Sequence, residues 1–382
     1  MYFIMVKDEL NIGIVCYPSI GGSGIVATIL GNALCAWGFR VHFISYDTLP
    51  RLRELAPHCL FHHVDVPDYY VFRYPPYTLA LASELCRITE EHNIPLVHVH
   101  YAVPHSTAAV WAKDMRKKLH GNDTKIITTL HGTDSYLVGQ IPSCKPIVEF
   151  SINSSDMVTA VSNHLKKSVE DTFNISDEIR VVYNPMDTGL FVPKKKKHKR
   201  KNKVLLHISN LRPIKRVMDA IHIFNMVQRV IPAQLWIVGE GPDLESAQQL
   251  AQKLGIKDSV KFKRSVLKIE EILEEADLLL STSEVESFGL TVAEAMAMEI
   301  PVVAYGVGGI PEVIGNPDVG VTVPFGKTCT AAEAAIDILS NCEKAHNMGK
   351  AARRYIVDNF ELDKIVYQYI NIYSEVLGMK LL

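Results

Sequence analysis

Short apolar segments alternate along the chain with longer segments whose apolar residues recur at helical spacing. The short segments are rich in Val and Ile, and they are continuously apolar rather than alternately apolar and polar. Continuous hydrophobicity is typical of strands buried on both faces, as in parallel sheets covered by helices. Because this alternation fills both halves of the 382 residues, it predicts an α/β fold with two doubly wound parallel-sheet, Rossmann-like domains. The predicted strands are residues 11–17, 41–46, 96–101, 125–132, 157–162 and 179–185 in the first half, and 204–209, 234–241, 260–265, 278–283 and 301–305 in the second.

Two segments stand outside this alternation. The basic run Lys194–Lys203 interrupts it near the middle of the chain. Blocks of like charge are usually exposed, so we expect a linker there, with contact to polyphosphate or lipid headgroups as the alternative. Segment 364–377 predicts a helix with one apolar face, which fits packing within the chain and leaves a homodimer open. That face consists of Ile365, Val366, Tyr369, Ile370, Tyr373, Val376 and Leu377.

Composition adds little to this organisation but excludes some classes of function. Hydrophobic residues make up 48% and charged residues 21%, which is typical of a folded globular protein. A formal net charge of -2 gives no general reason to bind nucleic acid or an anionic membrane. The opening segment is too short and too soon acidic for a secretory signal, and no apolar run is long enough to span a bilayer. Seven cysteines are scattered without a CxxC pair, so we expect free thiols in a reducing cytoplasm.

The residues that could bind a ligand or take part in catalysis lie directly after predicted strands, where open α/β sheets bind ligands. After the first strand, Gly21, Gly22, Ser23 and Gly24 allow close approach of the backbone to a phosphate or carboxylate at a helix start. The spacing is not GxGxxG, so a nicotinamide cofactor is not expected. A tight strand-to-helix turn is the alternative interpretation.

A basic cluster follows the first strand of the second half. Arg212, Lys215 and Arg216 lie within the segment HISNLRPIKR. An arginine can bind phosphate through two parallel hydrogen bonds, and a lysine adds a compact charge. A solvated basic turn is the alternative.

A pair of glutamates occupies the segment EVESFGLTVAEA. Glu286 lies in the expected loop and Glu294 about one turn inside the following helix, with Gly289 at the helix start. Carboxylates accept hydrogen bonds from the neighbouring hydroxyls of a sugar or ribose. Gly308 and Gly309 precede a further helix start. Together with the basic cluster, these residues predict a nucleotide-sugar site.

Four histidines near the strand ends are weighed separately. His98 and His100 lie on one face of a predicted strand, with His105 nearby. A metal site is not expected there, because no convincing carboxylate or cysteine ligands accompany them. His131 lies where a strand gives way to a loop and is expected to face the cleft.

The segment ESFGLTVAEA resembles the E-x7-E motif of the family four retaining glycosyltransferases, whose GT-B fold has two Rossmann-like domains facing a central cleft. The similarity continues through STSEVESFGLTVAEAMAMEIPVVAYGVGGIPEVI and covers nearly the whole chain. CYPSIGGSGIVAT, VHVHYAVPHS, TTLHGTD, VVYNPMD and HISNLRPIKRV resemble one branch of this family in particular. Members of that branch transfer N-acetylglucosamine from UDP to L-malate in bacillithiol biosynthesis.

The resemblance implies the substrates and the domain roles. UDP-GlcNAc would be the donor and L-malate the acceptor, with no metal or other cofactor and with neither nucleic acid nor membrane as a partner. Residues 1–190, joined by the C-terminal helix 361–382, would form the acceptor domain. Residues 191–360 would form the donor domain.

The resemblance also implies a role for each matching residue. Glu286 would bind the hydroxyls of the donor sugar, Glu294 the ribose, and Arg212 with Lys215 the diphosphate. His131 would contact the donor sugar at the reacting centre. Gly22, Gly289 and Leu290 would complete the donor site. The residues implied for acceptor binding are Ser23, Tyr101, Thr133, Asn184 and Arg73.

Some positions depart from the family pattern and leave alternatives open. Many relatives have an arginine where this chain has Asn210, and Met298-Glu299 stands where Cys-Gly is common. A different nucleotide sugar, a lipid or polysaccharide acceptor, a nucleotide-sugar epimerase on a similar fold, and a non-catalytic nucleotide-sugar sensor are the competing interpretations.

Overall fold

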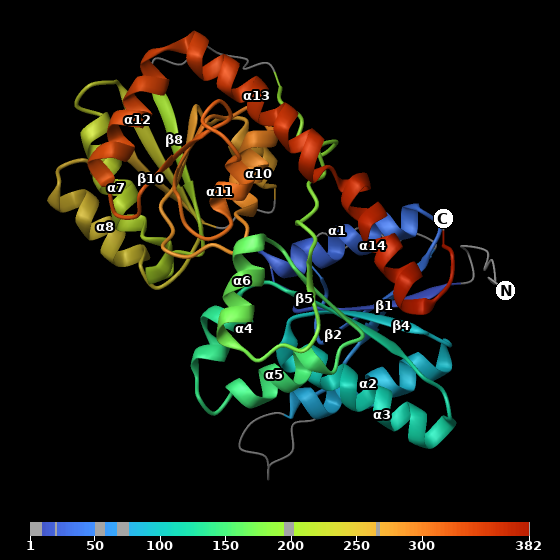
Figure 1. The fold of residues 1–382 in the computed structure, drawn as a ribbon. Helices are drawn as coiled ribbons and strands as arrows, with labels where there is room; N and C mark the ends of the chain where they lie inside the picture. Colours follow the sequence, from blue (N-terminus) through green and yellow to red (C-terminus); the bar gives the residue numbers. More distant parts are fainter. Residues whose placement is uncertain are drawn as a thin grey trace. The chain divides into compact units, whose positions relative to one another are not determined.

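Two compact units make up the chain, each built on a parallel sheet (Figure 1). The computed structural model describes residues 10–19, 21–49, 58–66, 76–194, 202–264 and 268–381. The first unit is Met1–Pro185 with Leu362–Leu382, and the second is Met186–Glu361. The predicted class, two doubly wound parallel-sheet domains, is confirmed.

Within the described residues, the first unit contains a seven-stranded sheet in the order β3-β2-β1-β4-β5-β6-β7, with all neighbours parallel. The order reverses between β1 and β4, and open α/β sheets commonly bind ligands beyond the carboxyl ends of the strands at such a point. The strands are β1 Asn11–Val15, β2 Arg40–Ser45, β3 Cys59–His63, β4 Leu96–His100, β5 Lys125–Leu130, β6 Met157–Ala160 and β7 Ile179–Val181.

Helices cover both faces of the first sheet. One apolar cluster joins the sheet to α1 and α14, and another joins it to α2 and α3. These helices are α1 Ser23–Ala36, α2 Tyr77–Glu91, α3 Thr107–His120 and α14 Leu362–Leu377, and the shorter ones are α4 Thr133–Tyr136, α5 Lys145–Asn153 and α6 Asn163–Thr172.

The second unit repeats this architecture with a six-stranded sheet among the described residues, in the order β10-β9-β8-β11-β12-β13. Its order reverses between β8 and β11. The strands are β8 Lys203–Ile208, β9 Ala233–Val238, β10 Val260–Lys263, β11 Leu278–Ser281, β12 Val302–Tyr305 and β13 Val321–Val323. The helices are α7 Val217–Val227, α8 Leu244–Lys253, α9 Ile269–Leu273, α10 Leu290–Ala297, α11 Ile310–Ile314, α12 Thr328–Ser340 and α13 Cys342–Phe360.

The C-terminal helix α14 packs within the first unit (Figure 1). Ile365, Val366 and Ile370 from its apolar face are fully buried there. The Tyr373 hydroxyl also lies 2.8 Å from Nδ1 of the buried His98 on β4. The chain therefore passes between the units twice, at 185/186 and 361/362, whereas the sequence analysis placed its boundary at 190/191.

The expectation of free thiols is wrong for two of the seven cysteines. Cys35 of α1 and Cys59 of β3 form a disulfide with a Cα–Cα distance of 6.2 Å. Because 24 residues separate them in sequence, no local motif indicates the pairing. The remaining cysteines, Cys16, Cys86, Cys144, Cys329 and Cys342, are free.

The basic run is described only at its ends. The Lys194 ammonium bonds to Glu274, and Lys203 begins β8. Residues 195–201 lie outside the described residues, so the expected linker is untested there.

Candidate active site

In each unit, several of the predicted site residues lie in the loops at the point where the strand order reverses. In the second unit, the loop after β8 carries Arg212 and Lys215, and the loop after β11 carries Glu286. Because β8 and β11 are adjacent parallel strands, their following loops meet at the same edge of the sheet.

Hydrogen bonds join these two loops. The Thr282 hydroxyl donates to the backbone carbonyls of Lys215 and Arg216, each at 3.1 Å. The backbone N–H of Glu284 donates to the carbonyl of Ile214 at 2.7 Å. The Thr282 side chain and one backbone hydrogen bond thus hold the basic turn against the acidic loop, independently of any ion pair.

The Lys215 ammonium and the Glu286 carboxylate are in direct contact. Lys215 Nζ lies 2.5 Å from Glu286 Oε1, and the Ser283 hydroxyl donates to the same oxygen at 2.8 Å. Arg212 is exposed three residues before Lys215, with no ion pair among the described residues. A cation, a carboxylate and an accessible guanidinium therefore occupy one edge of the second sheet.

Glycines allow the backbone to approach Glu286 closely. Gly289, at the start of α10, has φ 102°, and a Cβ there would lie 2.4 Å from Ile310 Cδ1. A Cβ on Gly308, whose φ is 58°, would lie 1.8 Å from the Glu286 carbonyl oxygen. The Gly309 N–H donates to that oxygen at 2.9 Å. The second glycine segment therefore packs against Glu286, a role that the sequence analysis did not assign.

The two remaining donor-site candidates of this unit lie on α10. Leu290 begins the helix and is half-buried. Glu294 lies in the second turn of the helix and is 7% exposed. Its position inside the helix agrees with the sequence analysis, and its role in ribose binding remains a prediction.

In the first unit, three predicted acceptor residues come together beyond β1 and β4. Ser23 Oγ and the Tyr101 hydroxyl lie 2.5 Å apart and share a hydrogen bond. Burial raises the pKa of Tyr101, and hydrogen bonds with Ser23 and Thr133 partly offset this effect. Tyr101 has φ 87°, which is uncommon for a residue with a side chain and is found at positions held by their surroundings. Gly22 precedes this group at the start of α1, with φ 61° and open space where a Cβ would lie.

His131 is held by a second histidine. Nε2 of His131, directly after β5, lies 2.8 Å from Nδ1 of His100, at the end of β4. The other ring nitrogen of His100 is buried without a hydrogen-bond partner among the described residues. A buried N–H without a partner is costlier than a buried acceptor without one, so the unpaired Nε2 of His100 carries no proton. His100 Nδ1 therefore carries the proton and donates a hydrogen bond to His131 Nε2. His131 then carries its own proton on Nδ1.

Electrostatics keep these imidazoles neutral. Burial, with a smaller contribution from His105, lowers the pKa of His131 to about 3. Burial and the neighbouring imidazoles of His98, His131 and His105 hold the pKa of His100 well below its ordinary value. Hydrogen bonds, rather than ionic attraction, therefore orient His131.

The sequence analysis missed Asp134 as a site-forming residue. Its Oδ1 accepts a hydrogen bond from the Ala102 N–H at 2.9 Å, which ties the loop after β5 to the loop after β4. Burial raises the Asp134 pKa to about 6, although several backbone N–H groups oppose this shift. The segment HGTD contains this residue, but its partner lies 32 residues away in sequence.

Two predicted acceptor residues are not placed in the Ser23–Tyr101 group. Asn184 is buried just after β7, and β7 is separated from β4 in the sheet by β5 and β6. Arg73 lies outside the described residues. Their proposed contacts with an acceptor remain untested.

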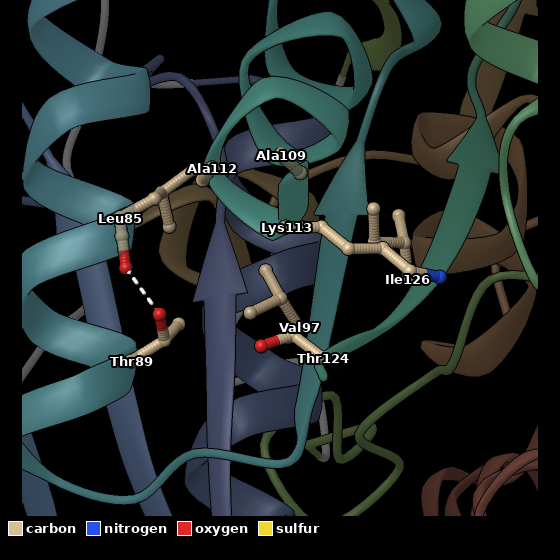
Figure 2. Close-up of a pocket in the computed structure, with 8 residues that line it drawn as sticks. All are labelled: Leu85, Thr89, Val97, Ala109, Ala112, Lys113, Thr124 and Ile126. Carbon is tan, nitrogen blue, oxygen red and sulfur yellow. Dashed lines mark hydrogen bonds between the residues drawn. The ribbon is translucent and has the colours of Figure 1, made fainter. Parts of the chain in front are cut away.

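Figure 2 shows a pocket elsewhere in the first unit, among α2, α3, β4 and β5. Its lining includes Leu85, Thr89, Val97 and Lys113. The Thr89 hydroxyl donates to the Leu85 carbonyl at 2.6 Å, and Lys113 Nζ lies 2.8 Å from an Asp156 carboxylate oxygen. Because its polar groups are already paired, this pocket is a feature of core packing and not a ligand site.

The sequence matches two family descriptions that together span most of the chain. Residues 20–190 match Glycosyltransferase Family 4. Residues 191–355 match Glycosyl transferases group 1. In the part of the chain that the structure describes, no helix is long and apolar enough to cross a membrane.

Two known proteins illustrate the similarity in sequence. The N-acetyl-alpha-D-glucosaminyl L-malate synthase of Bacillus anthracis is 41% identical over 376 residues, covering 97% of this chain and 98% of that protein. A GDP-mannose-dependent alpha-(1-6)-phosphatidylinositol monomannoside mannosyltransferase of Mycolicibacterium smegmatis is 28% identical over 319 residues, covering 77% and 81%.

Solved structures with low sequence identity share the fold. Anabaena HepE in complex with UDP-glucose has a TM-score of 0.82 at 17% identity, covering 96% of this chain and 100% of that chain. Sucrose-phosphate synthase from Thermosynechococcus elongatus has a TM-score of 0.81 at 19% identity, covering 97% and 99%. These likenesses support the predicted fold for both units.

Proposed function

The chain belongs to glycosyltransferase family 4, and from this premise we propose that it transfers N-acetylglucosamine from UDP-GlcNAc to the hydroxyl of L-malate. The product would be GlcNAc-malate, with the anomeric configuration of the donor retained, as the first step of bacillithiol synthesis. The observation that carries the proposal is the 41% identity to a GlcNAc-malate synthase over nearly the whole of both chains. We propose that the reaction takes place in the cytoplasm.

The second unit supplies the proposed donor site. Lys215 and Arg212 bind the diphosphate, and Arg212 is exposed and able to do so. Glu286, held by Lys215 and Ser283, binds sugar hydroxyls, and Glu294 binds the ribose diol. The UDP-glucose present in the HepE structure supports a nucleotide-sugar ligand for this fold.

The first unit supplies the proposed acceptor site. The start of α1, at Gly22 and Ser23, offers free backbone N–H groups to an anionic ligand. Tyr101, Thr133 and Ser23 form one hydrogen-bonding group that binds malate through its oxygen atoms.

The proposed transfer needs no protein nucleophile. The bond between the anomeric carbon and the diphosphate oxygen breaks while the bond to the malate hydroxyl oxygen forms on the same face. The malate hydroxyl proton passes to the departing diphosphate oxygen, so charge and atoms balance. Lys215 and Arg212 stabilise the charge that develops on UDP, a role that requires no bound metal.

The test is an assay of purified full-length protein with UDP-GlcNAc and L-malate. We expect release of UDP, a product with the mass of GlcNAc-malate, and an α-anomeric proton coupling in its NMR spectrum. D-malate, glycerol and lipid acceptors test the acceptor, and UDP-glucose tests the donor. Turnover with another acceptor but none with L-malate would refute the acceptor assignment, while conversion of UDP-GlcNAc without any acceptor would indicate an epimerase.

A further inference from the structure

Three histidine side chains meet on the first sheet, away from the residues assigned to the reaction. His42 lies on β2, His62 on β3 and His92 directly after α2. One ring nitrogen from each lies within 4.8 Å of the others. The ring centroids are 5.1, 4.7 and 5.0 Å apart in pairs. Each ring nitrogen in such a group needs a proton donor or acceptor of its own, and a metal ion can take the place of one.

The strand register brings two of these rings to one face of the sheet. His62 pairs with Ile44, the second residue after His42, so both histidines project from the same face. Helix α2 covers this face, and its end delivers His92. His42 is fully buried, whereas His62 and His92 are partly exposed, so an ion can enter from solvent.

Asn11 determines which ring nitrogen of His42 carries the proton. Its amide nitrogen donates to the backbone carbonyl of His92 at 2.9 Å, which turns its Oδ1 toward His42 Nε2 at 3.1 Å. Because Oδ1 only accepts hydrogen bonds, His42 Nε2 carries the proton and Nδ1 keeps a lone pair that can accept a hydrogen bond or bind a metal. In the metal-free protein, Nε2 of His62, 2.9 Å away, donates its proton to a hydrogen bond with this lone pair. Histidines that bind metals commonly donate their other N–H to a carbonyl oxygen in this way.

The charged groups nearby do not oppose a cation strongly. Arg87 is paired with Glu84 at 2.8 Å and with Glu91 at 2.5 Å. The second carboxylate oxygen of Glu91 lies 4.0 Å from His92 Nε2. Arg40, at the start of β2, is exposed to solvent.

We propose that His42, His62 and His92 bind one zinc ion, with water or the Glu91 carboxylate as the fourth ligand. Zinc binds imidazole nitrogen at about 2.0–2.1 Å in tetrahedral geometry, which needs nitrogens about 3.4 Å apart. The three nitrogens now lie within 4.8 Å of one another, so binding requires the rings to turn until they reach that spacing. His92 lies in the connection that enters the amino end of β4, whereas the candidate active-site residues follow the carboxyl ends of the strands. The ion therefore stabilises the fold, joining edge strand β3 and the end of α2 to the sheet, and takes no part in the transfer.

The test uses the full-length protein, stripped with a chelator and titrated with zinc sulfate or cobalt chloride. We expect about one zinc per chain after gel filtration, measured by mass spectrometry of the metal, and a higher Tm with zinc. Cobalt should give the intense visible bands of a tetrahedral site without a sulfur charge-transfer band, because the site contains no cysteine.

Matched variants locate the site. His62→Gln and His92→Gln should weaken zinc binding by more than about tenfold, and Asn11→Ala by about 10–100-fold. His63→Gln is the control, because His63 follows His62 on β3, projects from the opposite face and is 54% exposed. Circular dichroism of each metal-free variant checks that it folds. No zinc in the wild-type protein, or equal binding by wild type, His62→Gln and His92→Gln, would overturn the proposal.

Discussion

The Lys215 ammonium lies 2.5 Å from the Glu286 carboxylate, so that one ion pair connects the loops after β8 and β11. Both side chains are largely shielded, with exposures of 17% and 19%. A negatively charged diphosphate at this edge would meet Lys215 already oriented by its partner. Preorganised charge of this kind stabilises a transition state without reorganisation during the reaction.

Removing either member of this pair should therefore impair transfer. We expect Lys215→Ala to lower kcat/KM by about 10²–10³-fold, and Glu286→Gln to lower it as well. Glu284→Gln, in the same loop but exposed, should leave kcat/KM near the wild-type value. Initial rates of UDP release measure the effect. A Lys215→Ala enzyme as active as the Glu284→Gln control would contradict the role assigned to Lys215.

Gly308 should not tolerate a side chain. In Gly308→Ala the new Cβ would lie 1.8 Å from the Glu286 carbonyl oxygen, so the loop that carries Glu286 has to move. Gly326→Ala is the matched control, because Gly326 also has a positive φ, 75°, but has nothing within 4 Å of a Cβ. The unfolding free energy of the Gly326→Ala control should fall only by the cost of placing alanine in the left-handed region, about 1–2 kcal/mol.

Urea unfolding and kcat/KM separate the two glycine variants. Gly308→Ala should lose more unfolding free energy than Gly326→Ala, and it alone should lose activity. Equal losses in both variants would mean that the contact with Glu286 does not matter.

His100 should act through His131. His100→Gln removes the hydrogen bond at 2.8 Å that orients His131, so kcat should fall without a loss of folded protein. If the two act as a unit, the double variant with His131→Ala is no slower than His131→Ala alone. The coupling energy is then about 0.5–3 kcal/mol. If the losses in kcat from the two single variants add in the double variant, His100 acts independently of His131. His120→Gln, at an exposed position of α3, is the control and should leave kcat unchanged.

Acid should destabilise the fold from about pH 6.5 downward. Burial is the main cause that lowers the pKa values of several histidines, among them four with values of about 3, His98 and His131, and about 4, His105 and His207. Below pH 6.5 the unfolded chain binds protons on these residues and the folded chain does not, so the unfolding free energy falls toward pH 3–4. Each such proton contributes a slope of about 1.4 kcal/mol per pH unit.

Asp134 acts in the opposite direction over part of this range. Its pKa is raised from 3.8 to about 6, so its contribution to stability is present at low pH and is lost as pH rises through 6. The four histidines outweigh it. Urea unfolding at pH 7.5, 6.5 and 5.5 should show a smaller slope for His207→Gln, whereas His222→Gln, at an exposed position on α7, should match the wild type. An unfolding free energy that does not fall between pH 6.5 and 5.5 would contradict this account.

The sequence predicted most of the sheet because buried central strands are continuously apolar. Among the described edge strands, β7 and β10 were predicted, but β3 and β13 were not, because they lack a continuous apolar run. β3 reads CLFHH and β13 reads VTV, and each leaves residues partly exposed at a sheet edge. The histidine-rich β3 therefore lacks the apolar run on which the prediction depended.

Within the candidate site, local motifs indicated the loops but not the pairings across them. Arg212, Lys215 and Glu286 follow strands, which is visible in sequence. That β8 lies beside β11 depends on the strand order of the sheet, which local sequence does not reveal. The contact between Ser23 and Tyr101, 78 residues apart, and that between His100 and His131 depend in the same way on strand order.

The position of α14 determines how the first unit can be produced in isolation. A fragment ended at Pro185 would lack the helix that buries Ile365 and Ile370, and His98 would lose its tyrosine partner. Such a fragment should aggregate through the uncovered face. The backbone N–H of Met186 donates to the Phe360 carbonyl at 2.8 Å, so the two segments at which the chain passes between the units lie side by side. Splicing Pro185 to Leu362 through a few glycines should therefore give a fragment that folds on its own, in which the proposed binding of malate can be measured without the second unit.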